Sequence, residues 1–165
     1  MITFEIETVG AERFIRGFNR YVEDIQDFSE AFELLYLDFL ELEGRNFGAQ
    51  GTPAPWAALS PNYAKWKAKH APGRPILVLR GDMRAALTSR TGASGQIKEI
   101  DGRGKTARYG TSLKIASYHQ YGTRHMPARP VVQLTEADKR RWSRAIQTWA
   151  KSKLEEDLGQ GGILG

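Results

Sequence analysis

The chain has 165 residues, of which 41% are hydrophobic and 26% are charged, a balance typical of a folded domain rather than of a disordered or membrane-spanning protein. It contains no cysteine, which excludes disulfide frameworks, thiol nucleophiles and thiolate metal sites. The net charge of +5 conceals a division, since residues 1–59 carry 11 acids and 4 bases whereas residues 60–165 carry 8 acids and 20 bases.

The N-terminal part of the chain predicts a strand followed by amphipathic helices. Apolar and polar residues alternate over 2–7, which is the pattern of a half-buried strand, and no secretory signal is predicted there. Apolar residues then recur at helical spacing over 14–25 and again over 28–42, the second time opposite an acidic face. These patterns predict two helices or one bent helix, with a break at 23–27 where an aspartate can cap a new helix.

The middle of the chain predicts short helices and loops. A turn-rich, flexible loop is predicted near 48–55. Ser60, a capping residue type, precedes proline and predicts the start of a short basic helix over about 61–70. Asp82 can cap another short helix that ends near Leu87.

A hairpin and a further short helix come next. Residues 96–110 predict a β-hairpin, since Asp101-Gly102 is a favoured turn pair, and the preceding residues 88–95 are predicted to be flexible. A helical piece is predicted around 115–121. Val131 and its neighbours suggest an extended stretch after it.

The last element is a long helix. Thr135 can cap it and Asp138 can complete a capping box, while tryptophans recur at helical spacing further on. Gly159 is expected to stop the helix and to begin a frayed tail over 159–165. Together the elements predict a single α+β domain over 1–165, in which a small antiparallel hairpin packs with long N-terminal and C-terminal amphipathic helices, with short helices between.

Residues that carry chemistry are few. His119 and His125 stand six positions apart, which is no known zinc spacing, and no serine lies in a nucleophile-elbow motif. The sequence therefore predicts no enzyme, no metal site and no cofactor. The longest apolar runs, at 34–37 and 76–79, are far shorter than the roughly 20 residues of a membrane span, so no membrane partner is predicted.

The charge division leaves two interpretations open. Bases crowd residues 65–108 and alternate with Tyr63, Trp66 and Tyr109, a mixture that suits non-specific nucleic-acid binding. An acidic half and a basic half also suit head-to-tail association of identical copies. Composition alone does not choose between the two.

Three separated blocks, at 55–67, 76–87 and 115–130, carry a resemblance. In this order and spacing they resemble the phage virion morphogenesis (tail completion) family of Mu-like phages. The positions that match the family's pattern are Trp56, Leu59, Ser60, Lys67, Ile76, Leu77, Gly81, His119, Gln120, Tyr121, Gly122, Pro127, Ala128, Arg129 and Pro130. Arg80 and the Leu87-Thr88 pair depart from that pattern.

The resemblance implies a structural virion protein of the head–tail junction. Such a protein would act as a neck or tail-terminator component, form a homo-oligomeric ring, and contact the tail tube or terminator and the head–tail connector. It would be made in the cytoplasm of the host bacterium and end in the virion. The matched residues would serve the core, helix caps or interfaces, with interface or network roles favoured for His119 and Arg129.

A protein of the head–tail junction would also be close to passing DNA, which is a further expected partner. Basic residues of the predicted hairpin, Arg103, Lys105 and Arg108, are the candidates to face it. The alternative function is a stand-alone, non-specific nucleic-acid-binding module that uses the basic segment 65–108.

Overall fold

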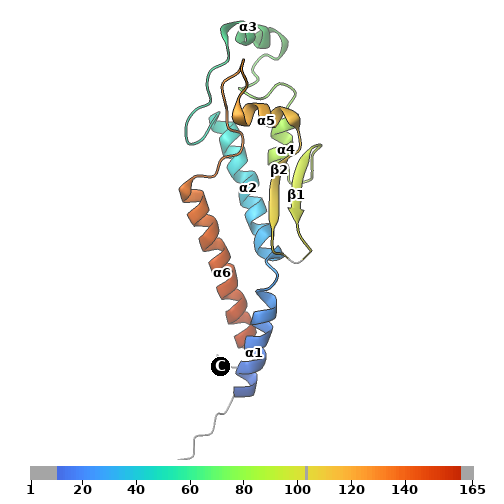
Figure 1. Ribbon diagram of the computed structural model, residues 1–165, viewed down its shortest axis with the longest axis vertical. Coiled ribbons are helices and arrows are strands. Elements are labelled where there is room, and N and C mark those ends of the chain that lie inside the picture. The colour runs from blue at the N-terminus through green and yellow to red at the C-terminus, as the bar shows by residue number, and fades with distance from the viewer. Residues whose placement is uncertain (1–10, 103, 161–165) are drawn as a thin grey trace, which may run out of the picture.

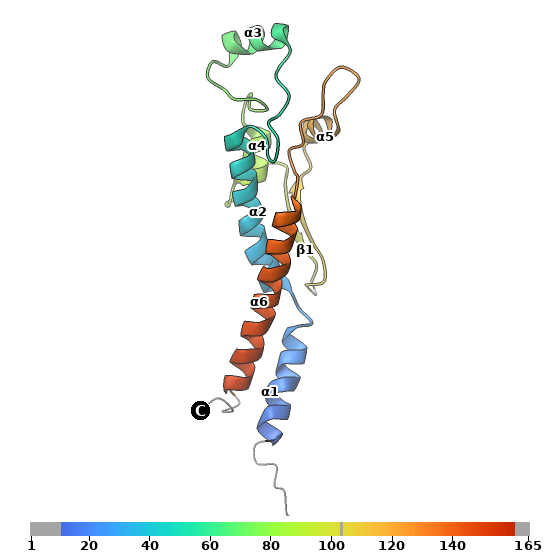
Figure 2. The same cartoon turned by 90° about the vertical axis from the view of Figure 1, so that its left-hand side faces the viewer.

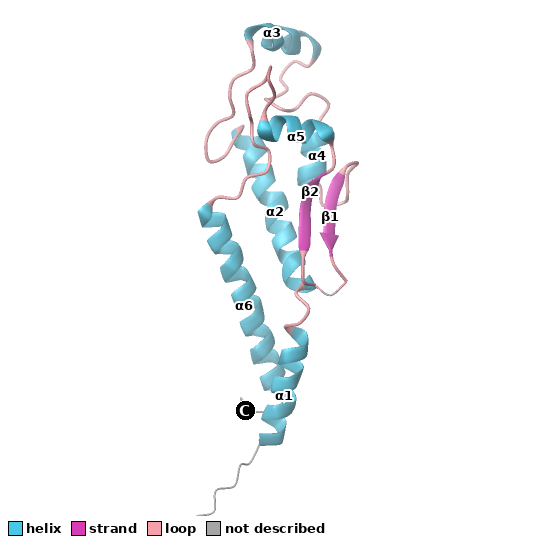
Figure 3. Cartoon of the chain, viewed as in Figure 1, coloured by secondary structure: helices cyan, strands magenta, loops and turns pink. Residues whose placement is uncertain are grey.

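The computed structural model describes residues 11–102 and 104–160, and the strand predicted at 2–7 lies outside them. In chain order the elements are α1 (Ala11–Asp24), α2 (Ser29–Ala49), α3 (Pro61–His70), α4 (Asp82–Thr88), β1 (Gln96–Ile100), β2 (Ala107–Thr111), α5 (Lys114–Tyr121) and α6 (Glu136–Gln160). The predicted α+β class is confirmed (Figure 3).

The molecule is elongated (Figure 1). Helices α2 and α6 run side by side along the long axis, and α1 packs against the C-terminal part of α6. The β1–β2 hairpin lies along α2, while α3 and α5 lie at the opposite end from α1 (Figures 1 and 2). None of the helices in the described part of the chain is long and apolar enough to cross a membrane.

The predicted break between the first two helices is confirmed. The Ser29 backbone N–H donates to Asp27 Oδ1 at 2.8 Å, so the aspartate satisfies one of the free donors at the start of α2. Phe28 N–H donates to the carbonyl of Gly104 in the hairpin turn at 3.1 Å. Gly104 has a φ of 58°, and a Cβ on it would lie 2.5 Å from Phe28 N, so only glycine allows this close approach.

Helix α2 continues to Ala49, beyond the predicted end at residue 42 and into the predicted loop at 48–55. The apolar pattern stops early because two of the later buried positions, Glu43 and Asn46, are polar. The helix ends where Gln50 adopts a left-handed conformation with φ 54°.

The hydrophobic core lies between α2, α4, the hairpin and the segment after α5. Its buried members are Tyr36, Phe39, Leu40, Phe47, Trp56, Val78, Met83, Leu87, Ala116 and Val131. Tyr109 of β2 packs its ring against Tyr36 and Phe39, and its hydroxyl donates to the Phe32 carbonyl at 2.6 Å. The hairpin is thereby fixed to α2.

The short elements agree with their predictions in type and differ in detail. The predicted hairpin is confirmed, with Ile100 opposite Ala107 next to the turn. The predicted start of α3 is confirmed, whereas the N-cap of α4 differs from the prediction by one residue. Ser60 is the N-cap residue of α3 but makes no side-chain cap hydrogen bond, and Gly81 rather than Asp82 occupies the N-cap of α4.

The extended stretch suggested at Val131 forms no strand. Its backbone is bonded instead by one side chain, because Gln120 Oε1 accepts from the N–H groups of Val131 and Val132 at 2.9 and 3.0 Å. Gln120 Nε2 completes the set by donating to the Val132 carbonyl at 2.9 Å. A side-chain amide therefore does what a neighbouring strand would do.

Helix α6 begins as predicted and ends later. Thr135 and Asp138 form the predicted capping box, in which Asp138 N–H donates to Thr135 Oγ1 at 3.2 Å and Thr135 N–H donates to Asp138 Oδ2 at 3.0 Å. Gly159 does not stop the helix, since α6 includes it and Gln160. Gly159 costs a helix about 1 kcal/mol relative to alanine, too little to end one by itself.

Ion pairs join the acidic and basic halves of the sequence within one chain. Among the described residues, pairs that cross between the halves include Glu30–Lys153 (2.9 Å), Glu33–Lys98 (2.6 Å) and Asp38–Arg141 (2.7 Å). Indole N–H groups of α6 reinforce two of these carboxylates, since Trp149 donates to Glu30 and Trp142 donates to Asp38. Part of the charge division therefore holds α2 against α6 and β1.

Candidate functional site

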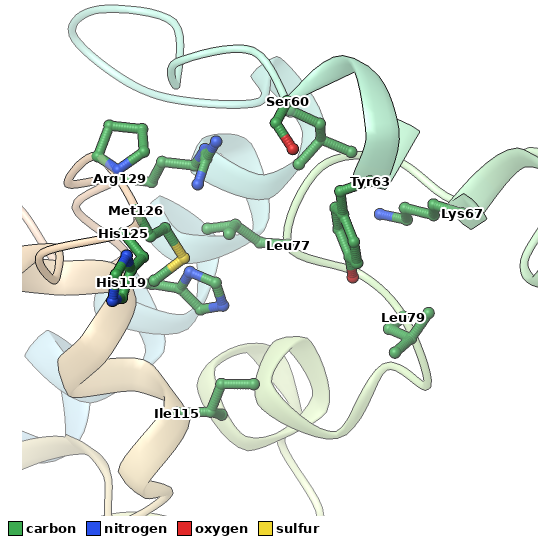
Figure 4. Close-up of a pocket in the computed structure, with 12 residues that line it drawn as sticks. Ser60, Tyr63, Lys67, Leu77, Leu79, Ile115, His119, His125, Met126 and Arg129 are labelled. Atoms are coloured by element: carbon green, nitrogen blue, oxygen red, sulfur yellow. The ribbon is translucent and has the colours of Figure 1, made fainter. Parts of the chain in front are cut away.

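A pocket of about 360 Å³ opens at the α3–α5 end of the molecule, and we call it the groove (Figure 4). Its walls come from the segment before α3, from α3 itself, from the loop before α4, from α5 and from the turn that follows α5. The lining residues are Leu59, Ser60, Tyr63, Lys67, Leu77, Leu79, Ile115, His119, His125, Met126, Pro127 and Arg129.

The groove collects residues from all three blocks that carry the family resemblance. The block at 55–67 contributes one wall, the block at 76–87 contributes the apolar Leu77 and Leu79, and the block at 115–130 contributes the side that includes His119 and Arg129. The fold thus brings together segments that lie far apart in the sequence.

Arg129 is the main polar anchor of the groove and is only 3% exposed. Its Nε donates to the Ala57 carbonyl at 2.7 Å and its Nη2 to the Ala58 carbonyl at 2.8 Å. Its backbone N–H donates to the His119 carbonyl at 2.7 Å. The partners of this arginine are therefore backbone carbonyls, and its bonds tie the segment before α3 to the end of α5.

Lys67 anchors the opposite wall. It is 4% exposed, and its Nζ donates to the Pro75 carbonyl at 2.5 Å, which closes the loop after α3 back onto the helix. Burial lowers the pKa of this amine because the charged form loses solvation. No carboxylate is within ion-pair distance of Lys67 among the residues that the structure describes.

His119 faces the groove with one ring nitrogen unpaired. Its Nδ1 is buried without a hydrogen-bond partner. Burial, and then the positive charge of Arg129, lower the pKa of this histidine, so the neutral form is favoured at pH 7. His125 is exposed on the turn that Thr123 and Met126 close by mutual backbone hydrogen bonds.

Gly122 lets the chain turn from α5 into this wall. Its φ is 74°, and a Cβ there would lie 2.8 Å from Ala128 N and 2.9 Å from the Met126 oxygen. Both the backbone conformation and the close packing therefore require glycine.

Three further motif residues fix the backbone of segments next to the groove. Trp56 is buried and donates from Nε1 to the Pro130 carbonyl at 2.7 Å. Gln120 holds the backbone after Pro130, as described above, and Gly81 starts α4 with a φ of 106°. These residues position the walls and do not line the cavity.

The hairpin residues predicted to face DNA lie elsewhere. Arg108 pairs with Glu99 at 3.5 Å, and the ammonium of Lys105 lies close enough to Asp27 to lower the pKa of that carboxyl, after the larger effect of the Ser29 hydrogen bonds. Arg103 lies outside the described residues. The described bases of the hairpin therefore have acidic neighbours and are remote from the groove (Figure 1).

Sequence reasoning missed the apolar rim of the groove. Tyr63, Leu79 and Ile115 line it and are 41%, 41% and 52% exposed. All three lie inside the resemblance blocks, and this position in the sequence was the one sign that they belong to the site. Apolar residues in short elements are expected to face a core, so periodicity could not reveal that these face a cavity open to solvent.

The lining has apolar walls, two buried cations and no aspartate or glutamate, so it favours an apolar segment that carries an acidic group. Within the described ranges there is no cluster of three or more histidine, aspartate or glutamate side chains that could hold a metal ion.

Comparison with known proteins gives one match. The model of the phage virion morphogenesis family matches residues 10–151, which include every residue of the groove. Searches among curated proteins and among solved structures give no match.

Proposed function

The chain belongs to the phage virion morphogenesis family, and we propose that within virion assembly it completes the tail and joins it to the filled head as a structural protein of the head–tail junction. One observation carries the proposal beyond the family's general role. The resemblance blocks converge on a groove whose polar anchors are buried and whose apolar rim is exposed.

An apolar rim of this kind is typical of a surface that another protein covers. Exposed apolar side chains that cluster around a cavity are uncommon on isolated soluble domains and mark interaction sites. Tyr63, Leu79 and Ile115 supply such a rim. The partners we propose are other copies of this chain, the tail tube or terminator, and the head–tail connector.

A homo-oligomeric ring is part of the proposal. Since Glu30, Glu33 and Asp38 already have partners within the chain, contacts between copies would use other charged surfaces. The α3–α5 end is rich in bases, whereas Glu23, Asp24 and Asp27 line an open cleft where α1 meets α2. Surfaces of opposite charge favour a heterologous contact, which makes a ring where the rotation between copies closes.

The groove's role is tested by an in vitro joining assay. A lysate with full heads and free tails, made without this protein, receives purified wild-type or variant protein, and infectious particles are counted. The L79E/I115E variant places two charges on the exposed rim, so we expect at least a hundred-fold fewer infectious particles with little change in thermal stability. Burying an unpaired carboxylate at an interface costs several kcal/mol.

The matched control is L34E/L37E on α2, where the two leucines are 53% and 43% exposed and lie away from the groove. We expect it to restore infectivity to within three-fold of wild type. Full activity of L79E/I115E would refute the role of the groove. An equal loss in both variants would show that the groove has no special part in joining.

A further inference from the structure

A cleft lined by arginines lies beside α4, separate from the groove. Its volume is about 440 Å³, and its lining includes Arg74, Arg80 and Arg84. The one acid in the lining is Asp82, which is 3.4 Å from Arg80 Nε with both side chains well exposed. Such an exposed pair contributes at most about 1 kcal/mol, so Arg80 can exchange this partner for another anion.

Two exposed lysines of α3 add positive charge at the same end of the molecule. Lys65 and Lys69 are exposed on a helix that projects from the body of the molecule (Figures 1 and 2). Arg74 lies in the segment that connects α3 to the cleft. Between residues 60 and 95 the sequence has Asp82 as its only acid.

Apart from Arg80, these bases have no ion-pair partner within the described chain. No ion pair there involves Lys65, Lys69 or Arg74, and none involves Arg84. The contrast is with the bases of α6 and β1, several of which pair with α2. An unpaired set of cations on one surface attracts an extended anion.

We propose that this basic surface, formed by Lys65, Lys69, Arg74, Arg80 and Arg84, binds the phosphodiester backbone of DNA without reading its sequence. Guanidinium and ammonium groups bind phosphate oxygens by charge-assisted hydrogen bonds and release counterions, and neither requires an apolar surface. The cleft offers little apolar surface, since its one large apolar lining residue, Val78, is 1% exposed. A protein partner would need an apolar centre of the kind that the groove has.

This DNA contact lies at α3 and α4, in the predicted basic segment 65–108 but not at the hairpin residues predicted to face DNA. The hairpin bases Lys105 and Arg108 have acidic neighbours. The bases of α3 and α4 have only one acid, Asp82, near them in the sequence. The biological setting rests on the proposed function, because DNA passes through a head–tail junction. DNA binding itself is measured on the purified protein and does not depend on joining.

The test is fluorescence anisotropy with a labelled duplex of about 20 base pairs over a range of salt. We expect wild-type binding with a Kd of roughly 1 to 100 μM near physiological salt, and a salt slope no steeper than about −4.5 for five phosphate contacts. The R74E/R80E/R84E variant is expected to bind at least ten-fold more weakly, with the slope reduced by about 2.7. The K65E/K69E variant tests the part of the surface on projecting α3, and we expect it to weaken DNA binding as well.

The matched control is K105E/R140E/R144E, which changes the net charge by the same amount on the hairpin and α6. These three side chains are exposed and remote from the cleft. We expect its affinity to stay within three-fold of wild type. Equal weakening of DNA binding in the control and cleft variants would show that only net charge matters, which would overturn the proposal. Absence of wild-type binding at 50 mM salt would also overturn it. Neither result affects the joining assay with L79E/I115E.

Discussion

Replacing Glu43 with glutamine is expected to raise the free energy of unfolding by roughly 3 kcal/mol at pH 7. Glu43 lies on α2 in the core and is 2% exposed. Burial raises the pKa of its carboxyl to about 8, against a small opposing effect of the Asn46 hydrogen bond. A neutral amide of the same shape avoids the free-energy cost of keeping an acid buried at a pH where it would ionise in water.

The sign of the pH dependence follows from the direction of this shift. The pKa of Glu43 is higher in the folded protein than in the unfolded chain, where it is near 4.5, so the folded state binds more protons between about pH 4.5 and 8. The stability of the wild type should therefore fall as pH rises through that window, by at most about 1.4 kcal/mol per pH unit. The E43Q variant should lose this slope and match the wild type near pH 4.5.

Urea denaturation at several pH values between 4.5 and 8 measures both effects. The matched control is E41Q, two positions away on α2, where the exposed Glu41 pairs with Arg45 at 3.6 Å. We expect this control to differ from wild type by less than 1 kcal/mol at every pH. An E43Q variant less stable than wild type at pH 7 would show that Glu43 is ionised and stabilising in the fold.

The R129M variant is expected to lose about 3 kcal/mol of stability. Methionine fills part of the same volume but leaves the Ala57 and Ala58 carbonyls without their donors, and a hydrogen bond to a charged group contributes about 1.5 to 3 kcal/mol. Because these bonds tie the segment before α3 to the end of α5, the groove should also lose its shape.

Thermal and urea unfolding measure this loss, and R124M is the matched control. Arg124 is exposed in the same segment, five residues away, and should tolerate the change to within about 0.5 kcal/mol. A variant R129M as stable as wild type would mean that the guanidinium does not hold these two segments together.

The helices and the hairpin are predictable from the sequence because their signals are local. The apolar periodicity of α1 and α2, the Asp101-Gly102 turn and the box of Thr135 and Asp138 each act over a few residues. The end of α2 was not predictable from periodicity, since its buried face continues through Glu43 and Asn46. The bonding of the backbone at Val131 depends on Gln120, a side chain that local patterns do not connect with it.

The groove is predictable only in part. Matching to the family identifies Lys67, His119 and Arg129 as residues of interest, but their neighbourhood depends on tertiary packing. Charge counting suggested that acidic and basic halves face each other between copies. The structure shows that part of this attraction acts within one chain, as at Asp38 and Arg141, which a count of charges along the sequence cannot reveal.

Electron microscopy of a lysate from a phage that lacks this gene tests whether the protein acts at the junction after heads and tails have been built. We expect full heads beside free tails of normal length, with few joined particles. A lysate of normal, infectious virions would contradict it.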